Sequence, residues 1–184
     1  MDDATLPPGP RDDDPAPDAY GRVTGAVRFA PLHGVARGLI ARLQAAYDVE
    51  VADATEELRR ERPAIPVLDA VRITPRAGSG TSLVVGLSPF PGVSLRFGRN
   101  GSAAFPTCGC DACDEQVKDE ADELRALVDD VVEGRVEEEV RRGPGTAELT
   151  LRRPGRAGTT YLYGGEAEAE GEPWRRTWGP WPRR

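Results

Sequence analysis

The sequence predicts an α+β fold, with an antiparallel sheet of about five strands and two main helices on one face. Two stretches carry apolar residues at helical spacing, and the chain between them alternates like strands joined by short turns. A length of 184 residues suits one core and is too short for two ordinary domains. We therefore expect one α+β domain over residues 20–184, ending in a Trp/Arg-rich segment.

The first 19 residues differ in composition from the rest of the chain. They contain five prolines and six aspartates, and Leu6 is their one aliphatic side chain larger than alanine. So little apolar surface does not offset the entropy lost on ordering a segment. We expect residues 1–19 to be a disordered, acidic, proline-rich leader.

The first helix is predicted to begin near Pro31, because proline is tolerated in the first turn. Its apolar stripe recurs at helical spacing and consists of Leu32, Val35, Ala36, Leu39, Ile40, Leu43, Ala46 and Tyr47. Residues 53–62 are charged and compatible with a helix, but Pro63 and Pro66 indicate a connector.

Strand patterns follow at residues 67–73, 83–87 and 93–97. A Gly-Ser-Gly turn and a Pro-Gly corner separate them, so the connections are short and the strands should form an antiparallel meander.

The clearest helical pattern covers residues 114–142, where apolar residues alternate steps of four and three. Gly134 ends or weakens this helix, and we interpret residues 136–142 as a frayed extension. After a Gly-Pro-Gly turn, residues 149–151 and 160–163 are typical of a hairpin.

The charge of the chain is acidic, with 31 Asp and Glu against 24 Lys and Arg. This balance argues against nucleic acid as a partner and is compatible with a protein partner, although nothing in the sequence identifies one. The first residues carry no secretory signal, and no apolar stretch approaches the roughly 18 residues of a membrane span. We expect a cytoplasmic protein that does not contact membranes.

Three cysteines within six positions are the densest candidate for chemistry. Cys110 and Cys113 have a spacing that lets one turn present both sulfurs to a metal ion, and Gly109 lets the backbone bend so that Cys108 joins them. A thiolate site suits zinc, which is therefore the cofactor that we consider.

A fourth zinc ligand is not evident from the pattern. Asp111, Asp114 and His33 are candidates, and a water molecule would leave the position open. The sequence has no second cysteine pair, so the zinc signature is incomplete.

Two other interpretations of the cysteines stay open. If a helix begins near Asp111, Cys113 lies in its first turn, where the helix dipole lowers a thiol pKa and favours redox chemistry or thiol catalysis. Alternatively, the sulfurs only pack the helix start while Asp111 or Asp114 caps it.

His33 is the only histidine in the chain, and we expect it on a helix surface with a local hydrogen bond. The C-terminal tail combines three tryptophans with arginines. We expect Trp178 and Trp181 to anchor this tail against the domain, although stacking on bases or lying at a membrane interface are alternatives.

Several short motifs resemble an uncharacterised family of actinomycete bacteria, a domain of unknown function with a CGCDACDE motif. They are Tyr20-Gly21-Arg22-Val23-Thr24, Phe90-Pro91-Gly92, Phe105-Pro106, Cys108-Gly109-Cys110-Asp111-Ala112-Cys113-Asp114-Glu115 and the terminal Trp178-Gly179-Pro180-Trp181-Pro182-Arg183-Arg184. The resemblance implies a bacterial, cytoplasmic setting and no particular reaction.

We therefore expect a non-enzymatic binding or regulatory module, with a structural zinc at Cys108, Cys110 and Cys113. No residue is assigned a catalytic or cofactor-binding role. The alternative is a small thiol- or metal-dependent enzyme that uses Cys110 or Cys113 with His33.

Overall fold

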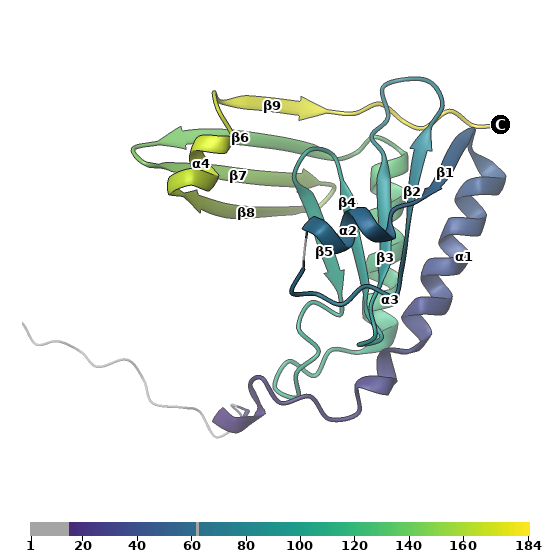
Figure 1. The fold of residues 1–184 in the computed structure, drawn as a ribbon, viewed down its shortest axis with the longest axis vertical. Coiled ribbons are helices and arrows are strands. Elements are labelled where there is room, and N and C mark those ends of the chain that lie inside the picture. Colours follow the sequence, from purple (N-terminus) through teal and green to yellow (C-terminus); the bar gives the residue numbers. More distant parts are fainter. Residues whose placement is uncertain (1–14, 62) are drawn as a thin grey trace, which may run out of the picture.

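The computed structural model describes residues 15–61 and 63–184, which form two antiparallel sheets flanked by helices (Figure 1). The predicted α+β class and the five-stranded antiparallel sheet are confirmed. The leader predicted over residues 1–19 lies outside the described residues up to residue 14, and Pro17–Ala19 forms the short 3-10 helix η1. A second 3-10 helix, η2, covers Ala26–Phe29.

The first sheet is a meander in which every strand pairs antiparallel with the next along the chain. Its strands are β1 (Val49–Asp53), β2 (Asp69–Pro75), β3 (Leu83–Leu87), β4 (Val93–Phe97) and β5 (Gly101–Phe105), in the order β1-β2-β3-β4-β5. All five residues of β3 are buried, because helices cover both of its faces. Three of these strands match the predicted meander, and β5 is a free edge of this sheet.

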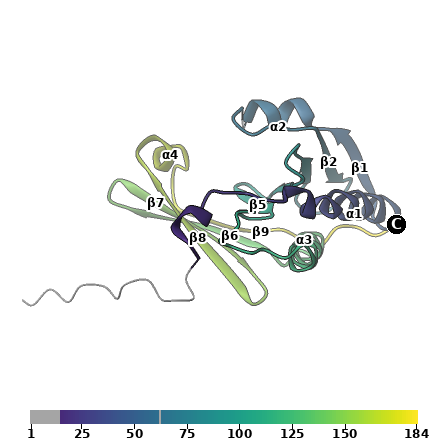
Figure 2. The same cartoon turned by 90° about the horizontal axis from the view of Figure 1, so that it is seen from below.

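Helices α1 (Pro31–Ala46) and α3 (Val117–Val132) cover one face of the first sheet (Figures 1 and 2). Their apolar stripes meet the side chains of β2, β3 and β4 in one core, in which Leu32, Leu43 and Leu124 are fully buried. The prediction of two main helices on one face is confirmed.

The opposite face of the first sheet carries α2 (Thr55–Glu61), in the segment predicted as a charged connector. Leu58 of α2 packs with Val84 and Ala70 in a second, smaller core. Gly86 permits this approach, because a Cβ there would collide with the Leu58 side chain. The helix covers only part of the face, over β2 and β3.

The second sheet consists of β6 (Glu137–Gly143), β7 (Thr146–Arg153), β8 (Arg156–Tyr163) and β9 (Trp174–Thr177), in the order β8-β7-β6-β9. The short helix α4 (Gly164–Ala169) packs on one face through Ala167. The predicted hairpin is confirmed as β7 and β8. The prediction that residues 136–142 extend a helix is wrong, because β6 gains backbone partners from β7 on one side and β9 on the other.

A buried carboxylate joins the two sheets. Glu138 of β6 is 0% exposed, and its oxygens accept hydrogen bonds from the backbone N–H groups of Arg99 (3.0 Å), Asn100 (3.2 Å) and Gly101 (2.7 Å) between β4 and β5. Burial raises the pKa of this carboxyl, although the three N–H groups act in the opposite direction. The contact gives acceptors to the backbone N–H groups of a partly buried turn.

The C-terminal tail docks on the first sheet, as predicted. Trp181 is 3% exposed, donates its indole N–H to the carbonyl oxygen of Thr81 at 2.8 Å, and meets Tyr47 edge-on at 5.8 Å between ring centroids. Trp178 is partly buried against the same core. In the part of the chain that the structure describes, no helix has both the length and the apolar character needed to cross a bilayer.

Candidate functional site

The three cysteines lie in an irregular turn, residues 106–116, between β5 and α3. Helix α3 begins at Val117, so the predicted helix start near Asp111 or Asp114 is wrong. Cys113 therefore precedes the helix and does not lie in its first turn. The reason is local, because Asp114 adopts a left-handed φ of 44° that interrupts any helix across it.

Tight backbone contacts close the turn. Gly109 has a φ of +76°, and a Cβ there would lie 2.8 Å from the Phe90 ring. The Glu115 carboxylate accepts hydrogen bonds from the N–H groups of Cys108 (3.1 Å) and Gly109. These hydrogen bonds close residues 108–115 into a turn in which the three cysteine sulfurs lie near one another.

Asp111 ties the cysteine turn to the segment that precedes η2. Its carboxylate accepts hydrogen bonds from the Thr24 backbone N–H (2.7 Å), the Thr24 hydroxyl (2.9 Å) and Arg22 Nε (3.1 Å). These contacts, led by the Thr24 N–H, lower the pKa of Asp111. Asp111 is thus an ionised anchor of the turn.

The three sulfur atoms all lie within 4.8 Å of one another. Cys110 Sγ and Cys113 Sγ are 3.4 Å apart, Cys110 is 2% exposed, and Cys108 and Cys113 are exposed. Thiolates around a tetrahedral zinc ion are separated by about 3.8 Å, given Zn–S bonds of about 2.3 Å. The sulfurs are therefore already at nearly the separation that such an ion requires.

The cysteine thiols differ in acidity because they hydrogen bond to one another. Hydrogen bonds from Cys108 and then Cys113 stabilise the Cys110 thiolate and lower its pKa to about 7. The same contact with Cys110 keeps the proton on Cys113 and raises its pKa to about 12. Cys110 is the thiol that ionises first.

None of the fourth ligands considered from the sequence joins this group. Within residues 15–61 and 63–184, the cluster of mutually close donor atoms consists of the three cysteines alone. His33 Nε2 lies 3.1 Å from the carbonyl oxygen of Gly92, 59 positions away, so the expected local hydrogen bond is wrong and a long-range one takes its place. The Asp114 carboxylate accepts a hydrogen bond from Gln116.

A cleft of about 810 Å³ runs along the free edge of β5 and has Cys108 in its lining. Its other walls are β4, the connector at residues 65–67, the α3 residues Glu120, Glu123 and Leu127, and residues 156–158 at the start of β8. Sequence reasoning missed this cleft, because its walls come from segments distant along the chain. The feature of the sequence that relates to this cleft is the run of small residues in β5, Gly101-Ser102-Ala103-Ala104.

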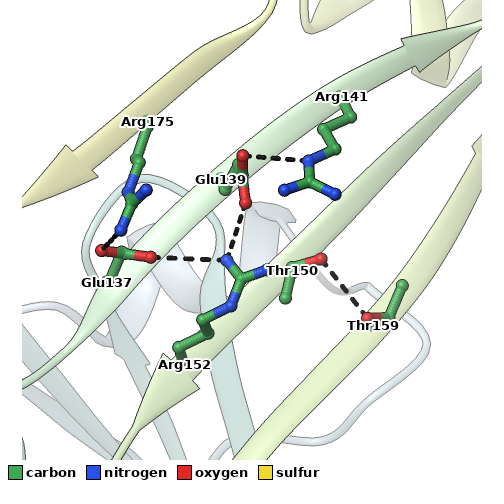
Figure 3. A network of polar contacts seen from close by, with 7 residues as sticks. All are labelled: Glu137, Glu139, Arg141, Thr150, Arg152, Thr159 and Arg175. Carbon is green, nitrogen blue, oxygen red and sulfur yellow. Dashed lines mark hydrogen bonds and ion pairs between the residues drawn. The ribbon is translucent and has the colours of Figure 1, made fainter.

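A separate set of charges covers the outer face of the second sheet (Figure 3). Glu139 accepts from Arg152 (2.7 Å) and Arg141 (3.0 Å), while Glu137 accepts from Arg175 (2.6 Å) and Arg152 (3.4 Å). Each carboxylate is neutralised by two arginines, and contacts with Arg141 and Arg152 lower the pKa of Glu139. This network links strands and lacks the free acid or base that catalysis needs.

Residues 6–184 match a family described as "Family of unknown function (DUF6226)", and the chain belongs to that family. No curated protein and no solved structure matched the chain.

Proposed function

Because membership of a family of unknown function assigns no activity, we propose that the protein is a non-enzymatic binding or regulatory module with a structural zinc ion in its cysteine turn. Cys108, Cys110 and Cys113 supply three thiolates. The observation that carries the proposal is the approach of all three sulfurs to within 4.8 Å of one another. Thiolates are soft ligands that favour zinc over magnesium or calcium.

The acidity of Cys110 also supports metal binding. Metal ions bind thiolates, and a pKa of about 7 means that Cys110 is already substantially ionised at neutral pH. Two sulfurs are exposed, so a water molecule or a donor from a partner completes the fourth position. We place the protein in the cytoplasm, where cysteines are kept reduced and available to a metal.

A bound ion would join three parts of the fold. The turn follows β5 and precedes α3, and Asp111 connects it to Thr24 and Arg22. Zinc therefore stabilises the packing of this end of the molecule without taking part in a reaction. A metal that binds only the folded chain adds its binding free energy to the free energy of unfolding.

The test is the metal content of the full chain purified under reducing conditions, together with its melting temperature. We expect about one zinc ion per chain, and a chelator should lower the melting temperature by roughly 5 °C or more. Cys110→Ser and Cys113→Ser should each lose most of the zinc. Thr107→Ala, which removes a neighbouring exposed polar side chain, should keep it. Protein that stays free of metal when zinc is supplied, with all three thiols reduced, contradicts the proposal.

A second candidate is a dithiol that exchanges electrons with a disulfide. It is favoured by the Cys110–Cys113 separation of 3.4 Å and by the low pKa of Cys110. In this reaction the two thiols form one disulfide and give two electrons and two protons to a disulfide of a partner, which becomes two thiols.

Thiol labelling in glutathione buffers of graded potential separates the two candidates. A redox pair forms a disulfide that Cys113→Ser abolishes and Cys108→Ser retains. A zinc site instead shows three thiols that are protected from labelling until a chelator is added.

A further inference from the structure

The cleft beside β5 is large enough for a small organic molecule. Its volume of about 810 Å³ falls in the range of about 300–1,000 Å³ that is typical of ligand sites. Apolar residues with accessible surface form much of its wall, among them Ile65, Pro66, Phe90, Ala103, Ala104 and Leu151. Such a lining favours the apolar body of a ligand, since burial of that body releases water.

Most charged groups in the wall already have partners. Arg153 contacts Glu123 and, at 3.2 Å, Asp130, and Arg156 lies 2.8 Å from Glu123. Arg96 contacts Glu61 in the same manner. These arginines are neutralised within the protein, so the cleft offers no free cation to an anionic ligand.

Glu120 of α3 is the exception. Its Oε2 is buried, and it is the one buried side-chain oxygen or nitrogen without a hydrogen-bond partner in the part of the chain that the structure describes. Burial, and then the charges of Glu115 and Asp119, raise the pKa of this carboxyl. Glu120 also lines the cleft, so a ligand that donates to its carboxylate supplies the hydrogen-bond partner that the protein does not.

We propose that this cleft binds an apolar organic amine, with its hydrocarbon body against β5 and its ammonium group donating to Glu120. The positive charge also relieves the repulsion among Glu120, Glu115 and Asp119. A carboxylate would increase that repulsion, and an alcohol would supply a donor without the charge. The site is therefore selective by charge as well as by shape.

Three probes of one shape test this selectivity: 4-phenylbutylamine, 4-phenylbutanol and 4-phenylbutyrate. Calorimetric titration of the full chain at pH 7.5 should show the amine binding at least about tenfold more tightly than the alcohol, because a charged hydrogen bond is worth about 1.5–3 kcal/mol. The carboxylate should bind more weakly than the alcohol.

Glu120→Gln should remove the preference for the amine and leave the affinity for the alcohol nearly unchanged. Glu168→Gln is the matched control, since it makes the same chemical change at an exposed position of α4 outside the cleft lining and should change amine affinity by less than about threefold. Ala104→Trp, which fills the cleft from β5, should weaken binding of all probes. Equal affinities for the three probes, an amine preference that survives Glu120→Gln, or no binding of any probe would each overturn the proposal.

Amine affinity should also fall as the pH drops and Glu120 gains its proton. This inference adds a ligand class to the proposed binding module and does not depend on the zinc ion. Measuring zinc in every titrated sample distinguishes the two proposals. Metal-free protein that still prefers the amine contradicts only the zinc proposal. Zinc-loaded protein that does not prefer the amine probe contradicts only the inference about the cleft.

Discussion

The two sheets of the molecule are stabilised by different forces. The first sheet lies between helices, its central strand β3 is buried on both faces, and its core contains Ile73, Leu83 and Leu95 at 0% exposure. In the second sheet, seven of the eight residues of the edge strand β8 are exposed, and paired arginines and glutamates cross the outer face (Figure 3).

The two sheets therefore differ in how much of their stability comes from a core of their own. Apolar burial contributes most of the free energy of folding, whereas exposed ion pairs contribute little. The second sheet buries a small core of Val140, Ala147 and Ala167. It therefore depends on its junctions with the first sheet, at Glu138 and at the contacts of Arg153 with α3.

The largest expected effect distinguishes the two cores. Leu124→Ala should lower the free energy of unfolding by about 2–5 kcal/mol, because it leaves a cavity at a fully buried position. Leu149→Ala, at a partly buried position of the second sheet, should cost less than about half as much. Urea denaturation of both variants measures this. Equal losses would remove the distinction between the layers.

The junction between the sheets should show the next largest effect. Both oxygens of Glu138 accept backbone N–H groups, so Glu138→Gln places an amide N–H₂ against a donor in either orientation and should cost about 1–3 kcal/mol. Glu148→Gln, a partly exposed position of β7, is the control and should change stability by less than about 0.5 kcal/mol. If the two variants melt at the same temperature, Glu138 does not hold the sheets together.

A smaller effect is expected on the outer face of the second sheet. Arg152→Ala removes contacts to Glu137 and Glu139 and should cost at most about 1 kcal/mol at low salt. Only part of that difference should disappear in about 1 M sodium chloride, because salt screens ion pairs that solvent reaches and these pairs are partly buried. Arg176→Ala, at an exposed position of β9, serves as the control in the same denaturation series. A loss that is large and insensitive to salt would mean that charge, and not burial, stabilises this sheet.

The smallest effect concerns the pH dependence of Glu120. Its pKa in the folded protein is raised above the ordinary value of 4.5, chiefly by burial, so the folded state holds this proton more tightly than the unfolded state. Its contribution to stability is complete below pH 4.5 and is lost as the pH rises through the raised pKa. Glu120→Gln should therefore become more stable than the wild type as the pH rises, by less than about 1 kcal/mol. A difference that is constant between pH 4 and pH 8 would contradict the assignment.

Local patterns were sufficient to predict three strands of the first sheet and the two main helices. The alternation in residues 83–87 and 93–97 matches β3 and β4, and the stripes that include Leu39 and Leu124 face the core. Burial on one face imposes a period on the sequence, and short turns leave few topologies open. The strands β1 and β5 were not predicted, because β1 is only five residues long and follows directly on α1, and β5 consists mostly of small residues.

The second sheet shows where this reasoning fails. Residues 137–143 read Glu-Glu-Glu-Val-Arg-Arg-Gly, a composition that suits an exposed helix, yet they form β6. Pairing with β7 and β9 overrides the local preference. Glu138 carries no local sign that it is buried, because its three donors lie in a distant turn.

The amino-acid sequence alone determined the α+β class, the meander, the helical stripes and the clustering of three cysteines in one turn, because all of these follow from contacts between residues close along the chain. Only the tertiary structure decided that Asp111 is engaged with Thr24 while His33 is hydrogen bonded to Gly92, and that a cleft with an unpartnered Glu120 opens beside β5. These features depend on segments far apart in the chain, which come together only when the shared core is buried.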